Sequence, residues 1–558
     1  FFLAGKKAYQ VERSLRFNIS DSTSLNRTQS TSPTNDKKGT LSFWVKRSDL
    51  EKNQHFYNVY TDGSNRGFLY FRSDSESIQF TQQVGGSFEF RLRTNRKLRD
   101  VSAWYHVVIA IDTTEGTASN RIKLYLNGIQ ETSFHTSDYP SQNIDVTFFN
   151  LANVKIGTAH DNQANEYFGG YVAEFNYIDG TPLTPSSFAE TDAITGQWNP
   201  KKYVGSYGTN GFYLNFSDNS GTTATTLGKD SSGNSNNFTP NNFSVSAGAG
   251  NDSVEDTPTN NFCTLNPLSL IGTGGTISNG NLDFTGDSNY STRAANFSLK
   301  TGKWYWEGTP TSVPSGSAPQ AFGIVRGTNI GSNSYIGYDP NGNVAGFGYF
   351  NGGSIKGAAG VGSTSGNNLA TGQTTYTQND VIGLASDIAN GTLAFYKNGT
   401  LVYTITGISS LDWFPAQTTY STGSKNSVNF GQRPFAHTPP TGYKALCSAN
   451  LPDPTIKLPN KHFDTLLWSG NSSTQAITGL SFSPDWVWSK RRSATSSHYL
   501  SDTIRGVHKI LFSELTGAEY DGTSNNDGVD SFDSNGFTFN NGTYVADYNA
   551  SGSTYVGW

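Results

Sequence analysis

The sequence has no methionine, few cysteines and little charge, and each shortage excludes a class of protein. Two cysteines in 558 residues, Cys263 and Cys447, cannot form a disulfide framework or supply a structural zinc site. Charged residues make up 15% of the chain and the net charge is −5, whereas nucleic-acid binding needs a concentrated basic face. No run of 18 apolar residues occurs, so no segment is predicted to cross a membrane as a helix.

Methionine is missing even at position 1, and residues 1–10 lack the charge pattern of a signal peptide. We therefore expect a processed chain or a fragment of a longer one. Residues 555–558 have the pattern of a strand interrupted midway, so a truncated C-terminus is also expected. Cys263 and Cys447 flank one predicted domain whose ends can lie close together, which leaves a disulfide open, although two separate thiols are favoured.

Aromatic residues and turn formers are abundant. The 36 Phe, 28 Tyr and 10 Trp far exceed what a disordered chain carries. Sixty Gly, with many Asn, Ser and Thr, suit frequent turns between short strands. Helical periodicity is absent except for one short turn at 185–190. The chain is predicted to be all-β, a series of β-sandwiches, and its length predicts about three to five domains.

The first domain is expected over residues 11–199, after an N-terminal segment at 1–10. Residues 39–46 alternate apolar and polar side chains, and 104–112 form a more apolar run typical of a central strand. Residues 121–128 alternate and end in Asn-Gly, which tolerates the positive φ angles of a type I′ hairpin turn. Together with "YFGGYVAEFNYIDGTPLT" at 167–184, this order of strands resembles the laminin-G-like, concanavalin A-like jelly roll.

A segment rich in Gly and Asn, residues 200–262, follows the first domain. A plain linker would lack its recurring phenylalanines, so Phe212, Phe216, Phe238 and Phe243 are expected to pack on a neighbouring sandwich. The stretch resembles the connector that follows the jelly roll in many phage structural proteins.

The second sandwich is expected over residues 263–447, before a linker at 448–460. Residues 380–399, "DVIGLASDIANGTLAFYKNG", read as strand, turn, strand, turn. With "WYWE" at 304–307, "WFPA" at 413–416 and "VNFG" at 428–431, they resemble a SPRY domain, a protein-interaction module. Because SPRY domains bind through variable loops, the resemblance implies no particular ligand residue.

The third domain is expected over residues 461–558. Aromatic strands such as "DWVWSKRRS" at 485–493 resemble a domain found near the C-termini of phage tail and virion proteins. Its basic cluster, Lys490, Arg491 and Arg492, could contact an anionic glycan, although a solvated strand end is favoured.

Catalytic motifs are absent from the sequence, and no catalytic or cofactor-binding residue is assigned. Concanavalin-like glycosidases place a nucleophile and an acid/base on one strand as Glu-x-Asp-x-x-Glu. The nearest candidate, Glu174 before Phe175 and Asn176, lacks the second carboxylate. His106 lies inside an apolar strand and is expected to have one exposed face. We therefore expect a protein that is not an enzyme.

Calcium is the one cofactor kept open, because laminin-G-like domains often bind it through loop carboxylates and carbonyls. The metal site itself is unassigned. Two loops are candidates: Asp161, Asn162, Asn165 and Glu166 in one, and Asp521, Asp527, Asp530 and Asp533 in the other.

The domain order resembles that of phage tail-fibre and virion proteins. The resemblance implies a receptor-binding protein, homotrimeric and located on the virion, whose partners are other tail or capsid proteins and a host surface glycan or protein. A structural virion component without receptor binding is the alternative, and a carbohydrate-active enzyme is a third possibility. The resemblance identifies neither the receptor nor the residues that bind it.

Overall fold

The computed structural model describes residues 9–50, 52–150, 152–159, 166–193, 195–272, 274–287, 289–314, 319–326, 335–338, 346–357, 367–452 and 455–558. It divides into two compact units, residues 1–190 with 198–451, and residues 452–558 with 191–197. Nearly all of its regular structure is β, as the composition predicted. No helix among the described residues is long and apolar enough to span a membrane.

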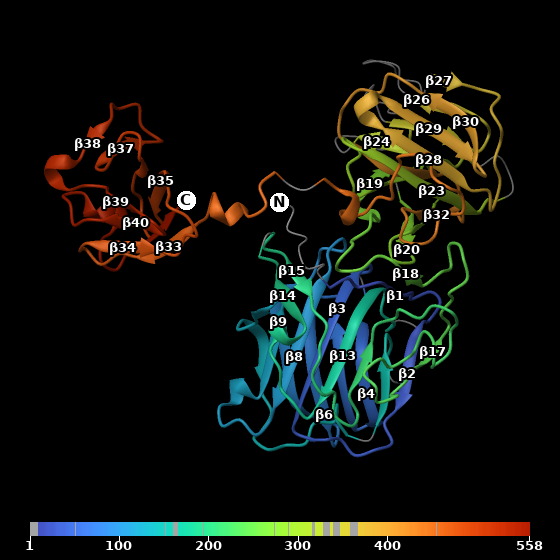
Figure 1. Cartoon of the computed structure of the whole chain (residues 1–558), viewed down its shortest axis with the longest axis horizontal. Helices are drawn as coiled ribbons and strands as arrows, with labels where there is room; N and C mark the ends of the chain where they lie inside the picture. The colour runs from blue at the N-terminus through green and yellow to red at the C-terminus, as the bar shows by residue number, and fades with distance from the viewer. Residues whose placement is uncertain are drawn as a thin grey trace, which may run out of the picture. The chain divides into compact units, whose positions relative to one another are not determined.

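The first sandwich packs two eight-stranded antiparallel sheets face to face (Figure 1). One sheet has the order β10-β9-β8-β3-β13-β1-β18, with β16 also paired to β13. Its strands are β1 (Ser14–Phe17), β3 (Lys38–Arg47), β8 (Tyr105–Asp112), β9 (Ile122–Leu126), β10 (Ile129–Gln130), β13 (Gly170–Asp179), β16 (Phe212–Leu214) and β18 (Ser253–Val254).

The second sheet of this sandwich has the order β11-β7-β6-β5-β4-β12-β2-β17. Its strands are β2 (Ser24–Thr28), β4 (Gln54–Asp62), β5 (Asn65–Phe71), β6 (Ser77–Val84), β7 (Ser87–Lys97), β11 (Phe134–Asp138), β12 (Asn153–Ile156) and β17 (Thr239–Asn241). A short hairpin, β14 (Ala189–Thr191) with β15 (Trp198–Pro200), follows the 3-10 turn at Pro185–Ser187.

Alternation along β3 explains the core of this sandwich. Leu41, Phe43 and Val45 point inward and are fully buried, because every second side chain of a strand faces the same way. The four connector phenylalanines lie in the same core, and β16, β17 and β18 of the connector add strands to both sheets. Residues 200–262 are therefore part of the sandwich and close its edges.

The second sandwich, in the same unit, packs two seven-stranded sheets. The first, in the order β19-β22-β31-β24-β25-β26-β27, contains β19 (Leu265–Gly272), β22 (Ser291–Ala295), β24 (Ala321–Arg326), β25 (Gly346–Phe350), β26 (Ile355–Gly357), β27 (Asn367–Ala370) and β31 (Trp413–Thr419). The second, in the order β20-β21-β32-β23-β28-β29-β30, contains β20 (Thr276–Ser278), β21 (Asp283–Thr285), β23 (Lys303–Ser312), β28 (Ile382–Asp387), β29 (Thr392–Lys397), β30 (Thr400–Ile405) and β32 (Lys425–Asn429).

The hairpin prediction for this sandwich is confirmed. Strands β28, β29 and β30 pair in sequence. Asn398 and Gly399 both have positive φ, +48° and +80°, as a type I′ turn requires. Phe262 bridges Cys447, so the ends of the domain do lie together, and both cysteines are buried free thiols.

The second unit is a smaller β domain with its own core. Its six-stranded sheet has the order β33-β41-β35-β36-β37-β38, with strands β33 (Leu466–Ser469), β35 (Trp486–Arg491), β36 (His498–Asp502), β37 (Lys509–Phe512), β38 (Tyr520–Asp521) and β41 (Thr554–Gly557). A three-stranded sheet of β34 (Gln475–Thr478), β40 (Gly536–Phe539) and β39 (Val529–Asp533) packs with it around Trp468 and Tyr555, and α1 (Val545–Tyr548) is a single turn.

Candidate functional site

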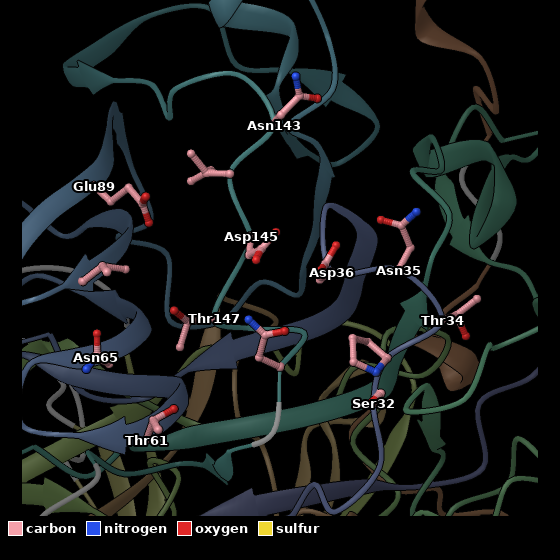
Figure 2. A pocket seen from close by; sticks show the side chains of 14 residues that line it. Ser32, Thr34, Asn35, Asp36, Thr61, Asn65, Glu89, Asn143, Asp145 and Thr147 are labelled. Carbon is pink, nitrogen blue, oxygen red and sulfur yellow. The ribbon is translucent and has the colours of Figure 1, made fainter.

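A large polar cavity lies at one end of the first sandwich (Figure 2). Its volume is about 960 Å³, and it is bordered by the loop before β3, the hairpin ends of β4–β7 and the loop before β12. Most of the side chains that line it carry a hydroxyl, amide or carboxylate group. The lining residues are Ser32, Pro33, Thr34, Asn35, Asp36, Thr61, Asn65, Val84, Glu89, Asn143, Ile144, Asp145, Thr147 and Asn150.

Two buried side chains hold the loops of this cavity in place. Gln82 accepts a hydrogen bond from the amide of Thr147 at 2.8 Å and donates to the carbonyl of Asp145 at 3.2 Å. On the opposite wall, Asp179 accepts hydrogen bonds from the amides of Thr34 and Asn210, at 2.8 and 2.9 Å. Since both anchors are buried, the loops are fixed before any ligand arrives.

The three carboxylates of the cavity, on Asp36, Glu89 and Asp145, all accept hydrogen bonds from neighbouring side chains. Lys37 donates to Asp36 at 3.0 Å and to Asp145 at 2.5 Å, so its ammonium lies between the two carboxylates where a cation would otherwise bind. These two hydrogen bonds raise the pKa of Lys37. The third carboxylate, Glu89, accepts from the amide of Gln82. A ligand with several hydroxyl groups fits such walls.

Glu174 occupies a strained position on β13. Its φ is +52°, rare for a residue with a side chain, and the register of β13 with β3 shifts between Ala173 and Asn176. Its carboxylate accepts hydrogen bonds from the hydroxyl of Tyr213 at 2.8 Å and from that of Tyr9 at 3.0 Å. Burial raises the pKa of Glu174 to about 7.

The sequence offered no second carboxylate beside Glu174, and the structure supplies one from far along the chain. Glu12 lines the same pocket of about 240 Å³ and is exposed. Acid–base catalysis needs two groups directed at one substrate bond. Both oxygens of Glu174 are instead engaged by tyrosines, so the visible role of this carboxyl is to hold the segment at Tyr9 against β13. The absence of enzymatic activity stays a prediction.

The expectation that His106 has an exposed face is wrong. Its ring is completely buried and stacks on Trp44 at a centroid distance of 4.8 Å. The indole of Trp198 donates to Nδ1 at 3.1 Å, which leaves Nε2 to donate to Ser42 at 3.0 Å. Desolvation lowers the pKa of His106 to about 3, so the ring is neutral. The strand pattern missed this because residues near 198 cover the outer face of the sheet.

The carboxylates of the acidic loop in the second unit already pair with lysine, asparagine, tyrosine and serine side chains of the protein itself. Asp521 pairs with Lys509, and Asp530 accepts from Asn540 at 2.6 Å. Asp527 is buried and accepts from the hydroxyl of Tyr520 at 2.9 Å, while Asp533 accepts from Ser531 at 2.8 Å. Within the described parts of the chain, no group of three His, Cys, Asp or Glu side chains is arranged to hold a metal.

The other candidate calcium loop falls largely outside the described residues. Asp161, Asn162 and Asn165 are not described, and the carboxylate of Glu166 lies 3.7 Å from Nε2 of His55. Calcium binding therefore stays a prediction.

Two of the three side chains in the basic cluster of the third domain form hydrogen bonds within the protein. Lys490 donates to the carbonyl of Arg491 at 2.8 Å, and Arg491 donates to Ser553 at 2.7 Å. Both side chains are half-buried, whereas Arg492 is exposed.

Sequence reasoning missed an aromatic cluster on the second sandwich. Tyr335 stacks on Tyr290 at 4.2 Å and on Tyr338 at 4.9 Å between ring centroids. The ammonium of Lys356 lies 5.3 Å from the ring of Tyr335 and 4.7 Å from that of Phe350. Tyr290 is distant in the sequence from Tyr335 and Tyr338, so no local sequence pattern signals the cluster.

Comparisons with known proteins identify a family for each domain. Residues 19–187 match the concanavalin A-like lectin/glucanase superfamily, residues 277–433 match the SPRY domain, and residues 458–558 match a domain family of unknown function, DUF7483. No curated protein matches the chain.

Similar solved structures each cover about a third of the chain. The SPRY domain of human HERC1 is 17% identical to this chain. The match covers 30% of this chain and 99% of the HERC1 domain, with a TM-score of 0.25. A SAP-like pentraxin from Limulus polyphemus is 18% identical over 32% of this chain and 80% of its own, with a TM-score of 0.24. The TRIM65 PSpry domain is 15% identical to this chain. The match covers 30% of this chain and 92% of the TRIM65 domain, with a TM-score of 0.23. By the family matches, this chain carries a concanavalin A-like domain, a SPRY domain and a C-terminal DUF7483 domain.

Proposed function

We propose that this chain is a phage tail-fibre or other receptor-binding virion protein that attaches to a host surface glycan or protein, without catalysing a reaction. Two domains of binding type support the proposal, one of the concanavalin A-like lectin/glucanase superfamily and one SPRY domain. The resemblance of the domain order to virion proteins supplies the biological setting. In that setting the partners are tail or capsid proteins, and the assembly is a homotrimer.

The observation that carries the proposal is the buried junction between the two binding-type domains. Lys46 of β3 donates to Asp256 at 2.8 Å and to the carbonyl of Phe262 at 3.3 Å, where the chain enters the SPRY domain. The hydroxyl of Tyr171 donates to the carbonyl of Gly280 at 2.6 Å. A junction held by buried polar contacts keeps the two domains in one orientation, so both can be presented to a partner without a loss of interdomain freedom.

The chemistry of the cavity of about 960 Å³ supports a hydroxyl-rich ligand for the first domain. Its walls carry fixed hydrogen-bonding groups, and the ammonium of the adjacent Lys37 is already shared by Asp36 and Asp145. When a ligand binds, the hydrogen bonds between the walls and water are replaced by hydrogen bonds between the walls and the ligand. This replacement gives specificity with modest affinity. Low affinity per site suits an attachment protein that acts through several copies.

The test is binding of the fluorescently labelled full chain to candidate host cells, with cells stripped of surface polysaccharide as the control. Saturable binding that is lost on stripping supports attachment to glycans, and binding that survives stripping but is lost on protease treatment supports a protein receptor. If correctly assembled protein binds no candidate cell, the attachment function is contradicted in favour of a structural virion component. Its position would then be sought on the particle.

A further inference from the structure

Three tryptophans form a fixed group at one end of the DUF7483 domain. Trp488 donates its indole N–H to Nδ1 of His498 at 2.9 Å, which sets the orientation of the ring. Trp486 lies 6.1 Å and Trp558 lies 5.5 Å from Trp488 between ring centroids. Trp488 and Trp558 also exchange two backbone hydrogen bonds of 2.9 Å. Trp488 therefore supports the other two rings.

The two supported rings open onto a pocket of about 270 Å³. Phe463, Phe482 and Phe537 also line it, so five Phe and Trp side chains border one small space. Trp486 is 41% exposed and Phe463 is 57% exposed. Exposed aromatic rings that gather beside one pocket are typical of a ligand-binding site, whereas singly exposed rings are not. The large cavity of the first sandwich differs, because among its described lining residues none is aromatic.

Polar groups of both kinds surround these rings. Asp464 and Asp485 offer carboxylate oxygens that accept hydrogen bonds, and Lys461 offers an ammonium that donates them. A sugar residue has hydroxyl groups that donate and accept, and C–H groups on one face of its ring that pack on an aromatic side chain. A quaternary ammonium such as choline has no N–H to donate to the two carboxylates, and its charge would meet Lys461 as a like charge.

We propose that this pocket, with Trp486 as its stacking platform and Asp464 and Asp485 as acceptors, is a carbohydrate-binding site that takes one sugar residue of a surface glycan. The volume of about 270 Å³ suits a ligand of that size. The inference rests on the proposed attachment function and assigns part of it to the C-terminal domain. Because Trp488 holds the platform in place, little conformational entropy is lost when the sugar stacks.

The test is a titration of the full chain with neutral hexoses, N-acetylhexosamines and hexuronic acids, followed by saturation-transfer NMR, with choline as a cationic comparison. Trp486→Ala should weaken binding of the preferred sugar about tenfold, whereas Trp486→Phe, which keeps a ring, should retain most of it. Asp485→Asn should also weaken binding. Tyr544→Ala is the matched control, since Tyr544 is 49% exposed in the same unit and does not line the pocket.

Each outcome separates this site from the attachment function. Sugar binding lost in Trp486→Ala and kept in Tyr544→Ala supports the site, even if the chain fails to bind cells. No sugar binding by the unaltered chain, preference for choline, or equal affinity in both variants overturns it. Cell attachment that is unchanged in Trp486→Ala would leave the attachment function standing and place the glycan contact elsewhere. A change in oligomeric state on Trp486→Ala with unchanged sugar affinity would assign the ring to subunit contact instead.

Discussion

The ammonium of Lys46 lies 2.8 Å from a carboxylate oxygen of Asp256, and both side chains are completely buried. Asp256 also accepts hydrogen bonds from the indole of Trp104 at 3.1 Å and the amide of Phe262 at 3.3 Å. Taking two charges out of water costs free energy that this geometry offsets only while both partners are present. The pair therefore contributes little net stability, and its main effect is to hold the chain at Asp256 and Phe262, which leads into the second sandwich, against β3 of the first.

Removing one partner of this pair should be costly. Lys46→Met leaves the carboxylate of Asp256 buried without its counter-charge, so the free energy of unfolding should fall by about 3–5 kcal/mol. Urea denaturation of the full chain measures this. The control is Lys38→Met, which breaks the half-exposed pair with Asp112 and should cost below about 1 kcal/mol. Equal losses in the two variants would contradict the role of the buried pair.

Glu174 should make the first unit less stable as the pH rises toward neutrality. Its pKa is about 7 in the folded chain against an ordinary value of 4.5, so the folded state holds a proton that the unfolded state has lost. The free energy of unfolding should fall by roughly 3 kcal/mol between about pH 4.5 and 7 and then level off. Glu174→Gln should remove this slope in denaturant midpoints measured against pH, and Glu12→Gln, at an exposed position in the same pocket, should not.

His106 should make the first unit less stable as the pH falls, which is opposite to the effect of Glu174. Its pKa is about 3 in the folded chain against 6.5 ordinarily, so below pH 6.5 the unfolded state binds a proton that the folded state refuses. Stability should be lost as the pH falls from 6.5 toward 3, by roughly 5 kcal/mol for this group. His106→Gln should flatten the acid limb of the profile, and His135→Gln, at an exposed position, should leave it unchanged. An unchanged acid limb in His106→Gln would argue against a buried neutral ring.

The turn between β29 and β30 requires its glycine. Gly399 has φ of +80°, and an added Cβ would lie 3.0 Å from Nδ1 of His437. Gly399→Ala should therefore lower the free energy of unfolding by about 1–2 kcal/mol. Gly352→Ala is the comparison, because that glycine has open space and no left-handed φ. Thermal or urea unfolding of both variants measures the difference, and equal effects would show that the turn tolerates a side chain.

Local sequence rules predicted the strands and hairpins of this protein well. The Asn-Gly pairs at 127–128 and 398–399 both adopt positive φ, since a type I′ turn needs residues that tolerate that conformation. Period-two alternation predicted the inward side chains of β3, because one face of a strand must meet the core. Pro185–Ser187 forms the single short turn expected there.

The candidate sites could not be predicted in the same way. Tyr9 and Tyr213 meet Glu174 across 165 and 39 residues of sequence, and Trp488 meets Trp558 only after β35 and β41 pair. Such contacts depend on sheet register and on which loop covers which face. The sequence by itself therefore determined the all-β class and the turns, because those follow from interactions within a few residues. Only the tertiary structure decided the buried ion pair, the two shifted pKa values and the aromatic pocket, because these depend on burial and on groups that are distant along the chain.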